Sequence, residues 1–154
     1  MRDGDDAALW YALNRLMLDY WADVDENGGQ EAHKFYLPDG LYSIANSRFE
    51  GEQKILAFYA RRRHGTIMTR HLVSNVRVFG EDDRHARMVG VMCLYRADGK
   101  SPFQGARPPA MIADFEARCV LGADRSWRFQ SHELRPFIVG SDLPASIVIK
   151  PQVL

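Results

Sequence analysis

The sequence lacks the features that mark nucleic-acid-binding and membrane proteins. Its 20 Lys and Arg residues are balanced by 20 Asp and Glu residues, so the formal net charge is zero. Because a nucleic-acid-binding surface needs a basic excess, we expect no nucleic-acid partner, and we interpret the basic run at residues 61–64 as the exposed end of a helix. No apolar run approaches the ~20 residues that span a membrane, and the first six residues are polar apart from Met1. We therefore predict a cytoplasmic protein without a membrane partner.

Cysteine and histidine are too few and too scattered to predict a metal centre. The two cysteines, Cys93 and Cys119, lie in strand-like segments, and the five histidines show no i, i+4 pair. A zinc site needs Cys or His pairs at short spacing. The two thiols could face each other on paired strands, but we favour two buried, reduced cysteines. We expect no metal and no cofactor.

The length and composition predict one folded domain. The chain has 154 residues, of which 46% are hydrophobic and 26% are charged. These values are ordinary for a globular protein with a substantial core. We therefore expect a single domain over residues 1–154, with its core at about residues 9–140 and a tail at residues 141–154.

The first part of the chain has the spacing of helices. Apolar residues recur three and four positions apart, at Leu9, Leu13, Leu16, Met17, Tyr20, Trp21 and Val24. This spacing predicts one long helix with a broad buried face, ending near Asp25 because two glycines follow at residues 28 and 29. A short helix is expected at residues 30–36, closed by the Pro-Asp-Gly sequence at residues 38–40.

The remainder of the chain predicts a sheet. We expect a strand at residues 41–49, a helix at residues 52–63 and then four long strands at residues 68–79, 85–95, 110–121 and 127–137. Helices that precede a mainly antiparallel sheet predict an α+β fold, with the helices packed on one face. A curved sheet around the long helix would leave a pocket. The proline-rich segment at residues 100–109 is either a rim loop of that pocket or a disordered tip.

Two residues are candidates for chemistry. A carboxylate at Asp25 would face the negative end of the long helix, which costs a few tenths of a kcal/mol and suggests a compensating partner. His71 lies early in a predicted strand, where alternation would give it a common face with Val73, Asn75 and Phe79. A histidine held by a carboxylate is a useful base near neutral pH. Spacing alone, however, favours a solvated aspartate and a structural histidine.

Five segments together resemble a known superfamily. They are residues 20–25, 35–40, 49–51, 70–75 and 127–129. In order and spacing they are similar to the SnoaL-like branch of the nuclear-transport-factor-2-like superfamily, and they cover most of the chain. The resemblance implies a cystatin-like, cone-like barrel in which a curved sheet wraps around the N-terminal helix. It also implies an apolar cavity and a homodimer or homotrimer.

The resemblance also implies roles for individual residues. Relatives such as scytalone dehydratase, bile-acid dehydratases and a dehydrochlorinase use an Asp–His pair, and ketosteroid isomerase is a further relative. By position, His71 would remove a proton from carbon and Asp25 would orient it. Asp23 is the alternative carboxylate, because only one of the two can face inward on a helix. Tyr20 and Trp21 would line the pocket unless they belong to the core.

The group that would assist a leaving group is not identified by any motif. Arg118 and His132 are the candidates, since both lie on predicted strands.

A second resemblance leads to a different function. Residues 69–78 and 94–96 are similar to the small subunit of aromatic-ring-hydroxylating dioxygenases, which supports a separate iron-bearing subunit. In that case His71 would be structural.

Three hypotheses therefore stand. We favour an enzyme, a cofactor-free lyase or isomerase that acts on a hydrophobic cyclic molecule by general-base proton abstraction. The alternatives are the non-catalytic dioxygenase subunit and a small-molecule binding protein without chemistry.

Overall fold

A long amphipathic helix begins the fold. The computed structural model describes residues 3–63, 65–141 and 147, so His64 and most of the predicted tail lie outside the described residues. Helix α1 (Asp3–Asn27) buries the predicted apolar stripe, in which only Leu9 is partly exposed. Gly28 and Gly29 then adopt positive φ angles of 64° and 71°, which ends the helix. The prediction of a long helix with a glycine stop is confirmed.

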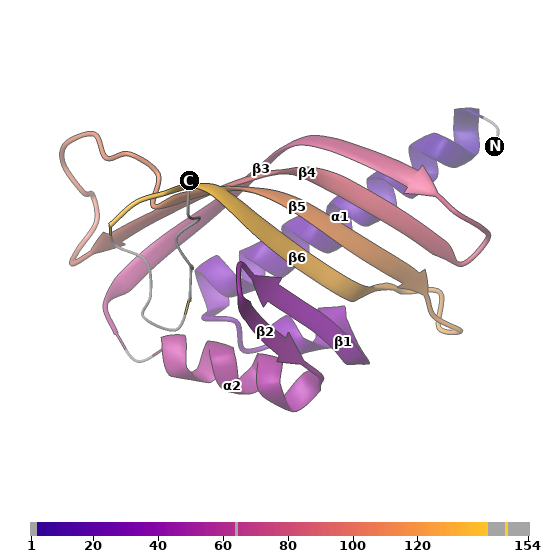
Figure 1. The fold of residues 1–154 in the computed structure, drawn as a ribbon, viewed down its shortest axis with the longest axis horizontal. Coiled ribbons are helices and arrows are strands. Elements are labelled where there is room, and N and C mark those ends of the chain that lie inside the picture. Colours follow the sequence, from indigo (N-terminus) through magenta and orange to yellow (C-terminus); the bar gives the residue numbers. More distant parts are fainter. Residues whose placement is uncertain (1–2, 64, 142–146, 148–154) are drawn as a thin grey trace.

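One mixed sheet of six strands lies against this helix. Its order is β2-β1-β6-β5-β4-β3, and β1 pairs with β6 in parallel whereas the other pairs are antiparallel. The strands are β1 (Tyr36–Ile44), β2 (Ser47–Glu50), β3 (Ile67–Gly80), β4 (His85–Asp98), β5 (Met111–Leu121) and β6 (Trp127–Val139). Figure 1 shows α1 running across one face of the curved sheet, with α2 beside the β1–β2 hairpin. The predicted α+β fold is confirmed, but the sheet does not close into a barrel.

The long strands follow the alternation expected from the sequence. In β5 the odd-numbered residues from Met111 to Cys119 are buried, and the even-numbered ones are at least partly exposed. Inward side chains of the sheet therefore meet the apolar face of α1, and together they form the core. Cys93 and Cys119 are both free, and neither is the strand partner of the other. Cys119 is buried as expected, whereas Cys93 is half-buried.

The first strand was predicted wrongly. The expected strand at residues 41–49 is a hairpin of β1 and β2, because Ala45 adopts a positive φ of 53° and turns the chain. The Pro-Asp-Gly sequence at residues 38–40 does not precede the strand but lies within β1, where the pairing with β6 is irregular between Tyr36 and Leu41. Proline has no backbone N–H to donate to a neighbouring strand. It is tolerated there because the pairing of β1 with β6 is interrupted at that point.

The two shorter helices were predicted with nearly correct positions. The expected helix at residues 30–36 is one 3₁₀ turn, η1 (Ala32–Phe35), and the expected helix at residues 52–63 is α2 (Glu52–Arg62). Helix α2 buries Ile55, Phe58 and Tyr59 against the hairpin and the core. Among the described residues no helix is long and apolar enough to cross a membrane. Ile147, in the predicted tail, packs against the core.

A β-bulge in β3 changes which side chains face inward. The register with β4 shifts between Ser74 and Arg77, and Asn75 has a φ of 54°. His71 therefore shares the inward face with Val73, but Asn75 and Phe79 turn outward and Val76 and Val78 replace them. The expectation that Asn75 and Phe79 lie on the face of His71 is wrong, because one extra residue reverses the alternation.

The bulge predicts that Gly90 is required for stability. A Cβ atom on Gly90 would lie 2.6 Å from Cε1 of Phe115 and 2.9 Å from the carbonyl oxygen of Ser74. Because the latter is backbone, Gly90→Ala is expected to lower the free energy of unfolding by about 1–3 kcal/mol in urea titrations. Gly65→Ala is the control, since a Cβ there has no atom within 4 Å. Equal stabilities of the two variants would contradict this account.

Candidate functional site

The end of α1 and the start of β3 are joined through one carboxylate. Oδ1 of Asp25 lies 2.6 Å from Nδ1 of His71 and accepts a hydrogen bond of 2.8 Å from the Thr69 hydroxyl. Oδ2 accepts a 2.8 Å hydrogen bond from the backbone N–H of His71. Because an ionised carboxylate only accepts hydrogen bonds, Nδ1 of His71 carries the hydrogen that it donates, and Nε2 is the nitrogen left to take a proton.

The geometry distinguishes the two candidate aspartates. Asp23 lies on the outer side of α1, where its carboxylate accepts hydrogen bonds from the Asn27 side chain at 2.7 Å and from the backbone of Glu31 at 3.1 Å. Asp23 therefore holds the glycine turn and η1 in place. Asp25 points inward, and its side chain is only 7% exposed.

Burial and the contact between the two side chains together determine the protonation states of Asp25 and His71. Burial alone would raise the pKa of Asp25, but hydrogen bonds and charge from His71, with the Thr69 hydroxyl, outweigh burial and lower the pKa. Burial lowers the pKa of His71 from 6.5; Asp25 opposes this effect and the positive charge of Arg62 adds to it. At neutral pH the site is therefore a carboxylate beside a neutral imidazole, which is the form that can act as a base.

Aromatic side chains fill the interior beside the pair. The Trp21 ring stacks on the His71 ring, with centroids 3.9 Å apart and planes inclined by 9°. Tyr20 and Trp21 are 0% and 2% exposed, so the structure places them in the core. The expectation that they line the pocket is not met, because the helical spacing that buries the whole stripe also directs both rings toward the sheet.

His132 is also a core residue. It is fully buried, and its Nδ1 lies 3.1 Å from the Tyr36 hydroxyl. Burial, together with the nearby His71, lowers the pKa of His132 to about 3. Burial raises the pKa of Tyr42 to about 12, and it raises the pKa values of Tyr20, Tyr36 and Tyr59 well above their ordinary value. The phenols and His132 are therefore neutral at pH 7.

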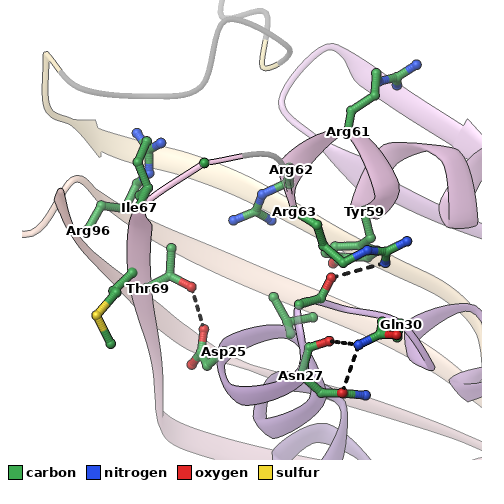
Figure 2. Close-up of a pocket in the computed structure, with 14 residues that line it drawn as sticks. Asp25, Asn27, Gln30, Tyr59, Arg61, Arg62, Arg63, Ile67, Thr69 and Arg96 are labelled. Atoms are coloured by element: carbon green, nitrogen blue, oxygen red, sulfur yellow. Dashed lines mark hydrogen bonds between the residues drawn. The ribbon is translucent and has the colours of Figure 1, made fainter. Parts of the chain in front are cut away.

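A pocket of about 630 Å³ lies between the end of α1, the end of α2 and the start of β3. Asp25 and Thr69 lie on its wall, and Figure 2 shows their hydrogen bond there. An apolar cavity was expected from the resemblance. The wall instead combines apolar and basic side chains. The residues that line the pocket include Val24, Asp25, Tyr59, Arg61, Arg62, Arg63, Ile67, Met68, Thr69 and Arg96.

Arg118 lies away from this pocket. It occupies an exposed position of β5, and its guanidinium lies 3.5 Å from Glu81 and 4.0 Å from Glu116. The expectation that it contacts a substrate is therefore not supported, because strand alternation puts it on the opposite face from the core. In the described part of the chain no three His, Cys, Asp or Glu side chains gather as ligands for a metal ion.

Two residues of the site were missed in the sequence. Thr69 is two positions before His71, so strand alternation could have placed both on one face. Arg62 lies in the basic run that we interpreted as an exposed helix end, and its position over the pocket depends on how α2 packs.

The sequence matches a known protein family over most of its length. Residues 7–133 match the model of the family described as the SnoaL-like domain. The chain belongs to this SnoaL-like family. The resemblance noted in the sequence is thereby confirmed for most of the chain. A search of curated proteins finds no match.

Solved structures share the SnoaL-like fold at low identity. A protein of Novosphingobium aromaticivorans DSM 12444, provisionally named a scytalone dehydratase, is 19% identical, with a TM-score of 0.81 over 99% of this chain and 100% of that one. A second protein from Novosphingobium aromaticivorans, provisionally named an aromatic ring hydroxylase, is 12% identical, with a TM-score of 0.71 over 90% and 93%. A third from that organism, described as nuclear-transport-factor-2-like with a cystatin-like fold, is 13% identical, with a TM-score of 0.68 over 88% and 86%. These likenesses establish the fold, and the different names show that the fold does not select one function.

The burial of His132 predicts a loss of stability in acid. Its pKa is about 3 in the folded protein and about 6.5 when unfolded, so between these values the unfolded chain binds more protons. The free energy of unfolding should fall as pH decreases through this window, by up to about 1.4 kcal/mol per pH unit from this residue. Urea titrations of His132→Phe between pH 7 and pH 4 should show a flatter dependence, with part remaining because the pKa of His71 is also lowered.

His85→Gln is the matched control for this measurement. His85 is exposed at the start of β4, so His85→Gln removes one histidine of the chain without changing the interior around His132. A wild-type slope in His132→Phe would show that the buried imidazole does not cause the acid sensitivity.

Proposed function

We propose that this protein is a cofactor-free lyase or isomerase that removes a proton from carbon with His71 as the general base. The observation that supports the proposal is the Asp25–His71 pair, with a 2.6 Å contact at Nδ1. Three hydrogen bonds from β3 fix the carboxylate, and the carboxylate fixes the imidazole. Positioning and tautomer are what a base needs to act repeatedly on a bound substrate.

The proposed step begins at a carbon next to a carbonyl group. Nε2 of His71 takes the proton, the C–H electron pair moves into the carbonyl π system, and the imidazolium is stabilised by Asp25. In an isomerase the imidazolium, whose N–H can exchange with solvent, returns a proton to another carbon of the substrate. In a lyase the enolate electron pair forms a C=C bond as the C–O bond to the β-carbon breaks, and the leaving hydroxyl group takes the proton from the imidazolium, so that water departs and His71 is neutral again. We propose a hydrophobic cyclic molecule as the substrate, because the wall of the pocket includes Val24, Ile67 and Met68.

We also propose that the protein assembles as a homodimer or homotrimer. The outer face of the sheet exposes large apolar side chains, among them Leu72 at 52% and Tyr95 at 40%. Exposed apolar residues grouped on one face are typical of contact surfaces. The alternative, a non-catalytic subunit whose partner is an iron-bearing dioxygenase subunit, stays a prediction.

Hydrogen exchange tests the base without knowledge of the product. Cyclic β-hydroxy ketones and cyclic enones are incubated with the protein in D₂O, and proton NMR follows deuterium incorporation or loss of water. His71→Gln is expected to lower the rate by about 10²- to 10⁴-fold, the usual contribution of a general base. Asp25→Asn should also lower it, because an amide can support the wrong tautomer.

The chain carries a matched control for this experiment. Asp82 and His85 form a second pair, 2.9 Å apart, that is exposed to solvent at the β3–β4 turn. His85→Gln should keep the wild-type rate, and circular dichroism should show the same fold in all variants. Wild-type rates in His71→Gln, or no reaction of any ketone with the wild-type protein, would refute the proposal.

The rate should depend on the protonation of His71. Only the neutral imidazole accepts a proton, so the rate should rise with pH through the pKa of His71 and be constant above it; since that pKa lies below 6.5, the plateau should include pH 7. Asp25 from α1, Arg62 from α2 and His132 from β6 are the titratable groups that influence it. Because Arg62 lowers the pKa, Arg62→Gln should shift the midpoint of the pH–rate profile upward. A downward shift would contradict this electrostatic account.

A further inference from the structure

The wall of the pocket beside Asp25 carries more positive than negative charge. Four arginines line it: Arg61, Arg62, Arg63 and Arg96. Among the described lining residues Asp25 is the one carboxylate, and both its oxygens already accept hydrogen bonds from Thr69 and His71. The described wall of the pocket therefore carries a surplus of positive charge, which favours an anionic ligand.

Arg62 is the arginine best placed to bind that anion. Figure 2 shows its guanidinium extending from α2 across the pocket toward β3, whereas Arg61 points away from it. The guanidinium carbon lies 5.4 Å from the Phe58 ring centroid and 5.6 Å from that of Tyr59. These distances are within the ~6 Å range of a cation–π contact, which restrains the guanidinium and leaves its N–H groups for hydrogen bonds.

The described neighbours of Arg62 do not neutralise it. Within residues 3–63 and 65–141 no carboxylate forms a salt bridge with Arg62. Arg63 differs, because it donates a 3.3 Å hydrogen bond to the carbonyl oxygen of Gly28 and so closes the glycine turn. A guanidinium that is restrained by cation–π contacts, faces a pocket and lacks a carboxylate partner is typical of a carboxylate- or phosphate-binding residue.

Apolar side chains complete the site. Ile67 and Met68 line the pocket at the start of β3 and are 50% and 39% exposed. Val24 lies on the wall formed by α1. A volume of about 630 Å³ is that of a site for a small organic molecule. The combination favours a ligand with one anionic group and an apolar body.

We propose that the ligand of this pocket carries an oxyanion, a carboxylate or a phosphate, that pairs with Arg62 while its apolar body lies against Ile67 and Met68. The ligand would then lie in the pocket whose wall includes Asp25, the residue hydrogen-bonded to the proposed base His71. The inference rests on the proposed function for the chemistry that follows, but the binding itself requires no turnover.

A simpler role for the arginines must be separated from this one. Arg61 and Arg62 both lie in the last turn of α2, where positive charge is favourable because of the helix dipole. That effect applies to both residues and needs no ligand. Arg61→Gln therefore matches Arg62→Gln in the change of net charge and in position on the helix.

Binding of three probes of similar shape tests the proposal. The probes are 2-naphthoate, 2-naphthyl phosphate and the neutral 2-naphthamide, and isothermal titration calorimetry gives their dissociation constants. For the wild-type protein at least one anion should bind about tenfold tighter than the amide, as expected for a charge-assisted pair. The preference should persist in Arg61→Gln and be lost in Arg62→Gln. The tighter of the two anions identifies the class of the natural ligand.

Each other result overturns the proposal. Equal affinity for the amide, no saturable binding of either anion, or a preference that survives Arg62→Gln would show that Arg62 does not select an anion. The same titrations with His71→Gln separate this inference from the proposed function. Anion preference in that variant should equal that of the wild type, so binding can be confirmed even if hydrogen exchange fails, and the reverse also holds.

Discussion

The site depends on the contact between the Asp25 carboxylate and β3. This carboxylate accepts hydrogen bonds from the Thr69 hydroxyl, from the backbone N–H of His71 and from the His71 imidazole. The position is unfavourable for a helix, since a negative charge meets the negative end of the dipole. The three donors offset that cost, because hydrogen bonds to the ionised form stabilise a buried carboxylate. The contact fixes the end of α1 relative to the edge strand of the sheet.

The rest of the fold provides what this contact needs. The Gly28–Gly29 turn lets the helix stop two residues beyond Asp25, and Asp23 holds the chain that leaves it. The bulge at Asn75 lets β3 present His71 and then Val76 to the same interior. The core beside the pair is aromatic, and its phenols and His132 stay neutral because burial disfavours their charged forms. Asp25 thus lies between this aromatic core and the arginine-lined pocket, where it is hydrogen-bonded to the neutral imidazole of His71.

Local patterns predicted the fold better than they predicted the site. Helix α1 and the long strands follow from spacings of three to four and of two, which depend on nearby residues alone. The bulge was missed because it requires Gly90 and Phe115 from other strands, and the β1–β2 turn was missed because alanine, at Ala45, is not a turn signal. Resemblance to a family, rather than spacing, selected Asp25 and His71. Nothing local in the sequence distinguishes Arg62, which faces the pocket, from Arg61, which does not.

The stacking of Trp21 on His71 couples the fluorescence of Trp21 to the protonation state of His71. The two ring centroids are 3.9 Å apart, and the other two tryptophans of the chain, Trp10 and Trp127, are both more exposed. A protonated imidazole withdraws electron density from an excited indole far more effectively than a neutral one does. Gain or loss of the proton on His71 should therefore change the emission of Trp21. The fluorescence of the buried Trp21 indole therefore reports whether His71 is protonated, without a label and without a bound ligand.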